Sequence, residues 1–319
     1  MFIEQSIREE NKFWKYVVGS VLIVVVWTIG QLPLLFAVTL KSMASGNGVP
    51  LDETTLMTTL DSNTTLFLLM LSTAFAIAGV YIAQRFIHKQ SLLSMLTTRP
   101  KLDWKRVFFA FGVWALLSVL SAVADYFMNP ADFVIQFKPI PFLILLVIAV
   151  LMVPIQTSSE EFLFRGYLMQ GFGGLARNRW IPLVLTSVIF GLLHIANPEV
   201  DKMGNIVLIY YIGTGFFLGI LTLMDEGMEL SLGFHAANNL VGALLVTADW
   251  SAFKTHAILK DVSEPSAGFD IILPVVIVYP ILLLLFSRKY KWTGWQEKLT
   301  GNIRLNPSTT PTETFRNDE

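Results

Sequence analysis

The stretch 158–172, S-S-E-E-F-L-F-R-G-Y-L-M-Q-G-F, places three charged residues in otherwise apolar surroundings: Glu160, Glu161 and Arg165. The preceding run 140–155, I-P-F-L-I-L-L-V-I-A-V-L-M-V-P-I, carries no charge. A charged side chain at the centre of a membrane helix costs roughly 2.5–3.5 kcal/mol on insertion scales, so such residues usually serve a function. What these three charges do is the main question that the sequence raises.

The composition is typical of a membrane protein. Hydrophobic residues make up 54% of the 319 residues, charged residues make up only 15%, and the mean hydropathy is +0.59. A helix needs roughly 20 apolar residues to cross the hydrocarbon layer. Eight runs approach this length, near 14–40, 64–86, 105–128, 140–158, 180–196, 205–224, 229–249 and 270–287. We therefore predict an all-α, polytopic membrane protein with about eight transmembrane helices.

The segments outside these runs are short. They predict an N-terminal segment at 1–13, a transmembrane domain at 14–289 and a C-terminal tail at 290–319. The tail contains N-P-S-T-T-P-T-E-T at 306–314. Segments rich in proline and small polar residues bury too little apolar surface to fold, so we expect the tail to be partly disordered.

Lysine and arginine predict the orientation, because cytoplasmic loops carry an excess of both. With eight spans, the two termini and every second loop share one side of the membrane. Those segments hold 18 of the 23 basic residues. The opposite side holds Lys41, Lys138, Lys202, Lys254 and Lys260. Both termini are therefore predicted to be cytoplasmic.

Charge and cysteine content exclude several functions. The net charge is −1 and the sequence contains no nucleic-acid-binding motif, so we expect no nucleic acid partner. The chain has no cysteine, which excludes disulfides, thiolate metal sites and a cysteine nucleophile.

Helical geometry assigns different positions to the three charges. Glu161 and Arg165 are four residues apart and lie about 40° apart around a helix, in the order that favours an ion pair. Glu160 lies about 100° from Glu161 and points elsewhere. We interpret Glu161 and Arg165 as a structural pair and Glu160 as free for chemistry. The alternative is a solvated charge cluster at a cytoplasmic helix end.

Two later spans carry further polar residues. Phe190 and His194 lie four apart in F-G-L-L-H, so the ring supports the imidazole. His235 and Asn239 lie four apart in H-A-A-N-N, with small alanines between them. Each pair alone also fits a structural role, with histidine bonded to a carbonyl or asparagine joining two helices.

Taken together, the three groups supply the parts of a hydrolytic site. Hydrolysis of an amide requires a base for water and donors for the developing oxyanion. Two other classes of protein remain open. A transporter or channel would use the same residues as a proton or ion relay, and a non-catalytic scaffold would only bind a partner.

The motifs E-E-x-x-x-R, F-x-x-x-H and H-x-x-x-N, in this order on separate spans, resemble those of the CPBP family. This family comprises type II CaaX prenyl proteases and the bacteriocin-processing or immunity-associated Abi proteins. Here the motifs read E-E-F-L-F-R at 160–165, F-G-L-L-H at 190–194 and H-A-A-N-N at 235–239. The resemblance covers a core at about 140–250.

The resemblance implies an intramembrane endopeptidase with a conical cavity that opens to the cytoplasm. In that reading Glu160 activates water with help from His194, and His235 and Asn239 bind the oxyanion. Glu161, Arg165 and Phe190 then support the site. The substrate would be a peptide or membrane protein in the inner membrane of a bacterium, and a prenylated CaaX protein is not specifically indicated.

The same residues leave the metal question open. Glu160, His194 and His235 are together a set that can bind Zn²⁺ with one open position. However, the chain has no H-E-x-x-H motif, and the ligands would come from separate spans, which demands precise placement. We favour a site without a metal cofactor.

Overall fold

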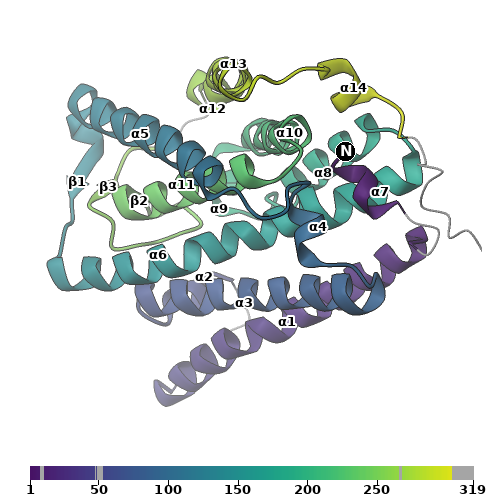
Figure 1. The fold of residues 1–319 in the computed structure, drawn as a ribbon. Coiled ribbons are helices and arrows are strands. Elements are labelled where there is room, and N and C mark those ends of the chain that lie inside the picture. The colour runs from purple at the N-terminus through teal and green to yellow at the C-terminus, as the bar shows by residue number, and fades with distance from the viewer. Residues whose placement is uncertain (8–10, 47, 49–52, 266–267, 304–319) are drawn as a thin grey trace, which may run out of the picture.

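The computed structural model describes residues 1–319 except 8–10, 47, 49–52, 266–267 and 304–319. Six helical segments are long and apolar enough to cross a membrane, and they are Phe13–Ala44, Ser62–Ile87, Trp104–Met128, Pro139–Ala176, Val207–Asp225 and Ile271–Tyr290. α1, α3 and α6 lie side by side (Figure 1). The three strands lie at one end of the molecule, while α7 and α14 lie at the other.

The helices of the first half are α1 (Phe13–Ala44), α2 (Glu53–Thr58), α3 (Ser62–Ile82), α4 (Leu92–Leu96) and α5 (Trp104–Met128). The second half contains α6 (Pro139–Glu161), α7 (Met169–Ala176), α8 (Trp180–Leu192), α9 (Pro198–Met203), α10 (Val207–Asp225), α11 (Glu229–Leu245), α12 (Phe269–Leu273), α13 (Tyr279–Tyr290) and α14 (Trp295–Thr300).

Two of the eight predicted spans are shorter than a membrane-crossing helix. The run 180–196 forms α8, which has 13 residues and is about 20 Å long. It ends at Leu192 because the chain turns there and carries His194 on the turn. The run 229–249 forms α11, which has 17 residues and ends where strand β2 begins. Residues 229–237 are buried throughout, so protein rather than lipid surrounds this part of α11.

The prediction of an all-α protein is wrong in one detail. Three short strands, β1 (Phe133–Ile135), β2 (Val246–Ala248) and β3 (Leu259–Asp261), form a sheet in the order β1-β3-β2. β3 pairs antiparallel with β1 and parallel with β2. The sheet joins the loop after α5 to the segment after α11. Strands that pair with partners distant in sequence leave no local pattern, which explains why the apolar runs in the sequence did not predict this sheet.

The charged stretch lies inside a continuous helix. α6 does not end before the charges, and a π-helical turn at Phe162–Leu168 connects it directly to α7. Glu161 and Arg165 are both 0% exposed. The alternative of a solvated cluster at a helix end is therefore wrong.

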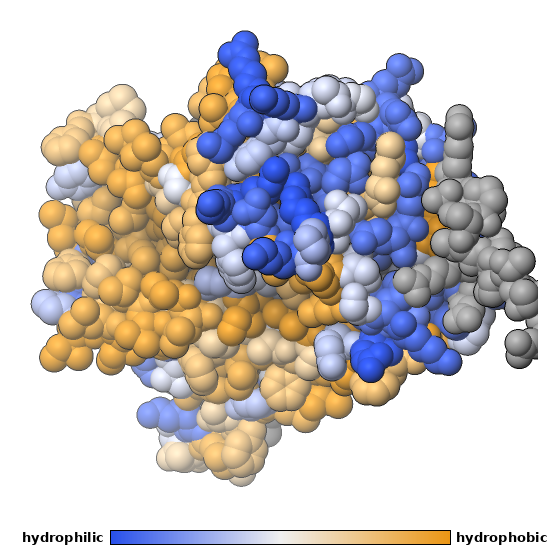
Figure 2. All heavy atoms as spheres, in the orientation of Figure 1, coloured by the Kyte–Doolittle hydropathy of each residue, from blue (hydrophilic) through white to orange (hydrophobic). Residues whose placement is uncertain are grey.

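The surface divides into apolar and polar regions. Large apolar side chains are exposed on α1, α5 and the first part of α6, among them Val21, Phe36, Phe108, Leu120 and Ile140. In Figure 2 these hydrophobic residues cover the half of the molecule that carries the sheet, and hydrophilic residues gather toward the other end. A chain with such exposed apolar helices is an integral membrane protein.

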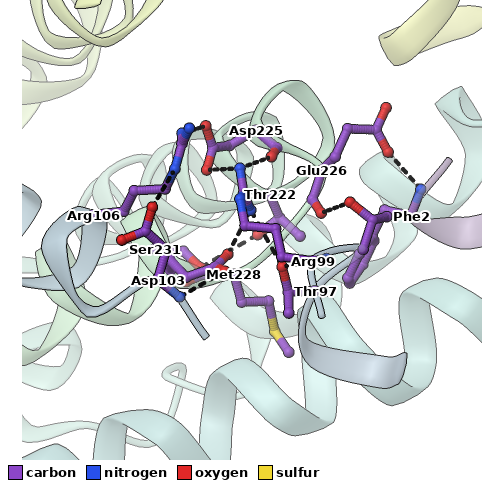
Figure 3. A network of polar contacts seen from close by, with 12 residues as sticks. Phe2, Thr97, Arg99, Asp103, Arg106, Thr222, Asp225, Glu226, Met228 and Ser231 are labelled. Atoms are coloured by element: carbon purple, nitrogen blue, oxygen red, sulfur yellow. Dashed lines mark hydrogen bonds and ion pairs between the residues drawn. The ribbon is translucent and has the colours of Figure 1, made fainter. Parts of the chain in front are cut away.

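A buried ion cluster closes the turn between α10 and α11 (Figure 3). Arg99 bonds Glu229 at 2.9 Å and Asp225 at 3.1 Å, and Arg106 also pairs with Asp225. The indole Nε1 of Trp292 donates to Asp225 at 3.1 Å. The side chains of Asp225 and Glu229 are only 1% and 0% exposed. The cluster fixes the start of α11, and with it the position of the motif residues farther along that helix.

The chain termini pack on the same end of the molecule. Phe2 and Ile3 are both 1% exposed, and the backbone N–H of Phe2 donates to Glu226 at 2.6 Å. After α14, the N–H of Ile303 donates to the carbonyl of Arg177 at 2.8 Å. The predicted tail is thus ordered as far as residue 303, and the remaining part of it, 304–319, lies outside the described residues.

His88 provides a test of packing at this end. Its ring nitrogens contact Asn11 Oδ1 and the Tyr167 hydroxyl, each at 2.9 Å. Burial and the nearby Lys15 lower the pKa of His88 from 6.5 to about 4. Between these values the unfolded chain binds more protons than the folded one, so stability is full above pH 6.5 and is lost as the pH falls toward 4.

We therefore expect the melting temperature of the detergent-solubilised protein to fall between pH 7 and pH 4.5, and less steeply for His88→Gln. The matched variant His256→Gln should retain the wild-type slope. Thermal unfolding at several pH values measures this. An identical slope in His88→Gln and wild type would show that His88 does not titrate in this way.

Candidate active site

The predicted catalytic residues line one cavity. Its volume is about 1230 Å³, and Glu160, His194, His235 and Asn239 all lie on its wall, together with Phe190. These residues come from α6, from α8 and the turn that follows it, and from α11. Three separate sequence motifs thus converge on a common space, while Glu161 and Arg165 are fully buried behind it.

Glu160 is the ionisable residue of the E-E pair that reaches the cavity. Its side chain is 27% exposed, whereas that of Glu161 is 0% exposed. The amide of Gln156, one turn earlier on α6, donates to Glu160 Oε1. Glu160 Oε2 lies 3.6 Å from His235 Nε2. Two adjacent glutamates therefore occupy different environments, one open and one closed.

Glu161 and Arg165 form the ion pair expected from their spacing. Arg165 Nη1 donates to Glu161 Oε1 at 3.1 Å, and Nη2 donates to the carbonyl oxygen of Gly215 on α10 at 3.1 Å. Glu161 Oε1 also lies 2.8 Å from His235 Nδ1. A single buried carboxylate therefore joins the arginine of one motif to the histidine of another.

Phe190 connects the motifs through its ring. The Arg165 guanidinium carbon lies 4.4 Å from the centre of this ring, within the range of a cation–π interaction. The rings of His194 and His235 lie 4.8 and 6.1 Å from it. The ring of Phe190 thus lies next to the buried guanidinium and next to both imidazoles.

The two histidines are held in different hydrogen-bonding states. His194 Nδ1 contacts the carbonyl oxygen of Phe190 at 2.7 Å. Since a carbonyl only accepts, Nδ1 carries a proton, and Nε2 of the neutral ring remains a proton acceptor. The His194 ring also stacks on Tyr211, with centroids 4.2 Å apart. His235 Nδ1 instead faces the Glu161 carboxylate, so Nδ1 carries a proton and Nε2 points toward Glu160, 3.6 Å from its Oε2 atom.

A series of side-chain amides leads to Glu160. Asn238 Nδ2 donates to Asn239 Oδ1 at 3.0 Å, Asn239 Nδ2 donates to Gln156 Oε1 at 2.9 Å, and Gln156 donates to Glu160. The indole Nε1 of Trp114 anchors the series by donating to Asn238 Oδ1 at 3.0 Å. Each amide is oriented by its neighbours. The position of the Glu160 carboxylate therefore depends on Trp114 from α5, on the two asparagines from α11 and on Gln156 from its own helix, α6.

Close contact between α8 and α10 allows this geometry. A Cβ at Gly215 would lie 2.7 Å from the carbonyl oxygen of Ser187, and one at Gly191 would lie 2.8 Å from the backbone nitrogen of Ile212. Only glycine permits such a short distance between the two backbones. The contact brings the Gly215 carbonyl within reach of Arg165.

Comparison with known proteins places the chain in a family. A family model described as type II CAAX prenyl endopeptidase Rce1-like matches residues 139–241. The chain is also 32% identical over 294 residues to the uncharacterized protein YyaK of Bacillus subtilis (strain 168), which covers 90% of this chain and 96% of that protein. The chain belongs to the Rce1-like CAAX endopeptidase family. No solved structure matches it.

The family match covers the motif residues that line the cavity, while other parts of the cavity wall lie outside it. The Rce1-like region runs from the start of α6 to within α11 and contains all three motifs. Family membership suggests a peptidase. The first three long helices lie outside the region that the family model matches, although the similarity to YyaK extends over most of the chain.

The donor set considered for zinc does not fit a metal shell in this Rce1-like protein. Within the described parts of the chain, no group of three His, Asp or Glu side chains is placed to hold an ion. Nδ1 of His194 contacts a carbonyl and Nδ1 of His235 contacts a carboxylate, which leaves Nε2 as the atom of each ring that could face an ion. A tetrahedral site would need Glu160, His194 and His235 to turn toward a single point.

Sequence reasoning missed two residues of the site. Gln156 precedes Glu160 by four, so a polar residue on the same face of an apolar helix was the available signal. Tyr211 stacks on His194 and accepts from Asn197 at 3.2 Å, and nothing in its own run, I-Y-Y-I-G-T-G at 209–215, distinguishes it. Asn238 joins two helices, because Trp114 on α5 donates to its side chain on α11.

Substitution of Arg165 should test the buried pair. We expect Arg165→Ala to destabilise the protein by about 3–5 kcal/mol, because it leaves the Glu161 charge buried without a cation. The double variant Arg165→Ala/Glu161→Gln should recover part of this loss. Thermal unfolding in detergent measures both, and a wild-type melting temperature for Arg165→Ala would contradict the pairing.

Proposed function

We propose that this protein is an intramembrane endopeptidase that hydrolyses a peptide bond of a membrane-associated or lipidated peptide or protein. One observation carries the proposal: a partly exposed carboxylate, Glu160, lies on a large cavity between the imidazole of His235 and the amide of Gln156. The membership of the chain in the Rce1-like family supports the same reaction class.

Glu160 is proposed to activate the water. A general base must lie within reach of the proton that it removes. Of the two adjacent glutamates, Glu160 is the one whose carboxylate lies on the cavity wall. The amide series fixes the Oε1 atom and leaves Oε2 for the water. The proton taken from water would later pass to the leaving amine, which completes the hydrolysis. His194, with Nε2 as an acceptor, would assist as a second base.

His235 and Asn239 are proposed to stabilise the oxyanion. Negative charge grows on the carbonyl oxygen as water attacks, and donors fixed in place before the reaction lower its energy most. Asn239 has a second N–H beyond the one that binds Gln156. His235 would offer Nε2–H to the oxyanion when the ring is protonated, while its Nδ1–H is held by the Glu161 carboxylate. In this reading Glu161, Arg165 and Phe190 position the catalytic residues and do not touch the substrate.

The location proposed for this activity is the inner membrane of a bacterium, with both termini in the cytoplasm. Its support is the bias of 18 against 5 basic residues between the two sides. Lipid bilayer and a polypeptide substrate are the partners that this reading requires.

Replacement of the base should separate fold from chemistry. We expect Glu160→Gln to lower peptide hydrolysis by about 10²–10⁴-fold, because the amide cannot accept the proton from water. Its melting temperature should stay close to that of the wild type, since the two side chains have nearly the same shape. A pool of quenched fluorescent peptides added to the reconstituted full-length protein provides the measurement.

The exposed Glu264→Gln serves as the matched control and should retain wild-type turnover. Wild-type turnover in Glu160→Gln would defeat the mechanism. An altered ion flux in Glu160→Gln would favour the transport alternative. If the wild type cleaves no peptide and both proteins bind a partner equally well, the scaffold alternative would be favoured.

A further inference from the structure

The cavity has its mouth at one end of the helices. Its rim includes Ser62 at the start of α3, Lys202 on α9, Asn205 before α10 and Lys254 after β2. Ser62 lies between α1 and α3, Lys202 and Asn205 lie between α8 and α10, and Lys254 lies between α11 and α13. Consecutive helices among α1, α3, α5, α6, α8, α10, α11 and α13 run in opposite directions. These rim residues therefore share the end of the molecule on which α1 finishes and α6 begins.

The N-terminal residues and Ile303, the last described residue, lie at the opposite end. Phe2 bonds the turn between α10 and α11, and Ile303 bonds the segment between α7 and α8. The family resemblance implies a cavity open to the cytoplasm, while the basic residues imply cytoplasmic termini. Both expectations cannot hold, because the mouth and the termini lie at opposite ends of the same helices.

The distribution of charge decides between them. Arg165 and Arg179 are buried and are left out of the count. Among the residues that the structure describes, the terminal end then keeps 13 basic residues against five at the mouth end. A bias of this size is the main determinant of orientation. The five include Lys202 and Lys254 on the rim itself.

We infer that the cavity opens on the non-cytoplasmic face, so that the substrate is an exported peptide or the extracytoplasmic segment of a membrane protein. This inference rests on the proposed function. Charged and polar side chains, Asp201, Lys202 and Lys254, line part of the mouth, and apolar Trp27, Leu66 and Leu69 line another part. An extended segment with both apolar and polar side chains suits that lining better than a lipid chain alone.

The absence of cysteine allows a direct test on the full-length protein in cells. Single cysteines are introduced at Lys202→Cys on the rim and at the exposed Lys105→Cys at the opposite end. Intact spheroplasts are treated with a membrane-impermeant maleimide. We expect Lys202→Cys to be labelled and Lys105→Cys to be labelled only after permeabilisation. The reverse pattern overturns the inference.

A second pair of variants tests the cavity itself. Leu69 lines the cavity, whereas Phe67 is 40% exposed on the same helix and is not on the cavity wall. A small charged methanethiosulfonate added outside should modify Leu69→Cys and spare Phe67→Cys, because a thiol in lipid does not ionise. Modification of Leu69→Cys only from the cytoplasmic side, or from neither side, overturns the inference.

Neither labelling experiment depends on catalysis. Labelling from outside combined with full turnover in Glu160→Gln would leave the access route standing and remove the proposed mechanism. Labelling from the cytoplasm combined with loss of turnover in Glu160→Gln would leave the proposed mechanism standing and remove the access route.

Discussion

The burial of one guanidinium organises the whole site. Arg165 is completely enclosed, and a charge in that position is tolerated only when its partners compensate for lost hydration. Glu161 neutralises it, the Gly215 carbonyl accepts from it, and the face of Phe190 covers it. These partners belong to α6, α10 and α8, so satisfying one arginine fixes three helices relative to one another. Glu161 extends the link to His235 on α11.

Two consecutive glutamates acquire distinct properties from this arrangement. Glu161 is fully buried, and its Oε1 atom contacts both Arg165 and His235, which makes it a structural anion. Glu160 is partly exposed, and the neutral amide of Gln156 holds its carboxylate in place. A base requires such a fixed position within reach of the water. The division between the two residues follows from the 100° step of the helix that carries them.

The sequence predicts the local part of this site well. The spacing of Glu161 and Arg165 predicted their contact because four residues bring two side chains onto one face of a helix. The apolar runs predicted the long helices, because the length of a run is a local property of the sequence. The approach of Gln156 to Asn239, the short sheet and the burial of Asp225 with Arg99 could not be predicted, since each depends on how helices distant in sequence pack. The resemblance supplied the grouping of the motifs, and its expectation of a cavity open to the cytoplasm differs from the side that the basic residues favour.

The π-helical turn at Phe162–Leu168 has a consequence for how this chain tolerates change in length. Such a turn contains one residue more than an α-helix of the same rise. Loss of a single position there would restore regular hydrogen bonding and leave the segment apolar and long enough to cross the membrane. α7 would keep its orientation relative to the glutamates, because the wider turn already absorbs its extra residue within the same rise. Gly171 and Gly173 would therefore keep their fit against Tyr16 and Ile3. Among related proteins a gap of one residue should be tolerated at this turn, whereas a gap in the regular helix on either side of it would rotate α7 by about 100°.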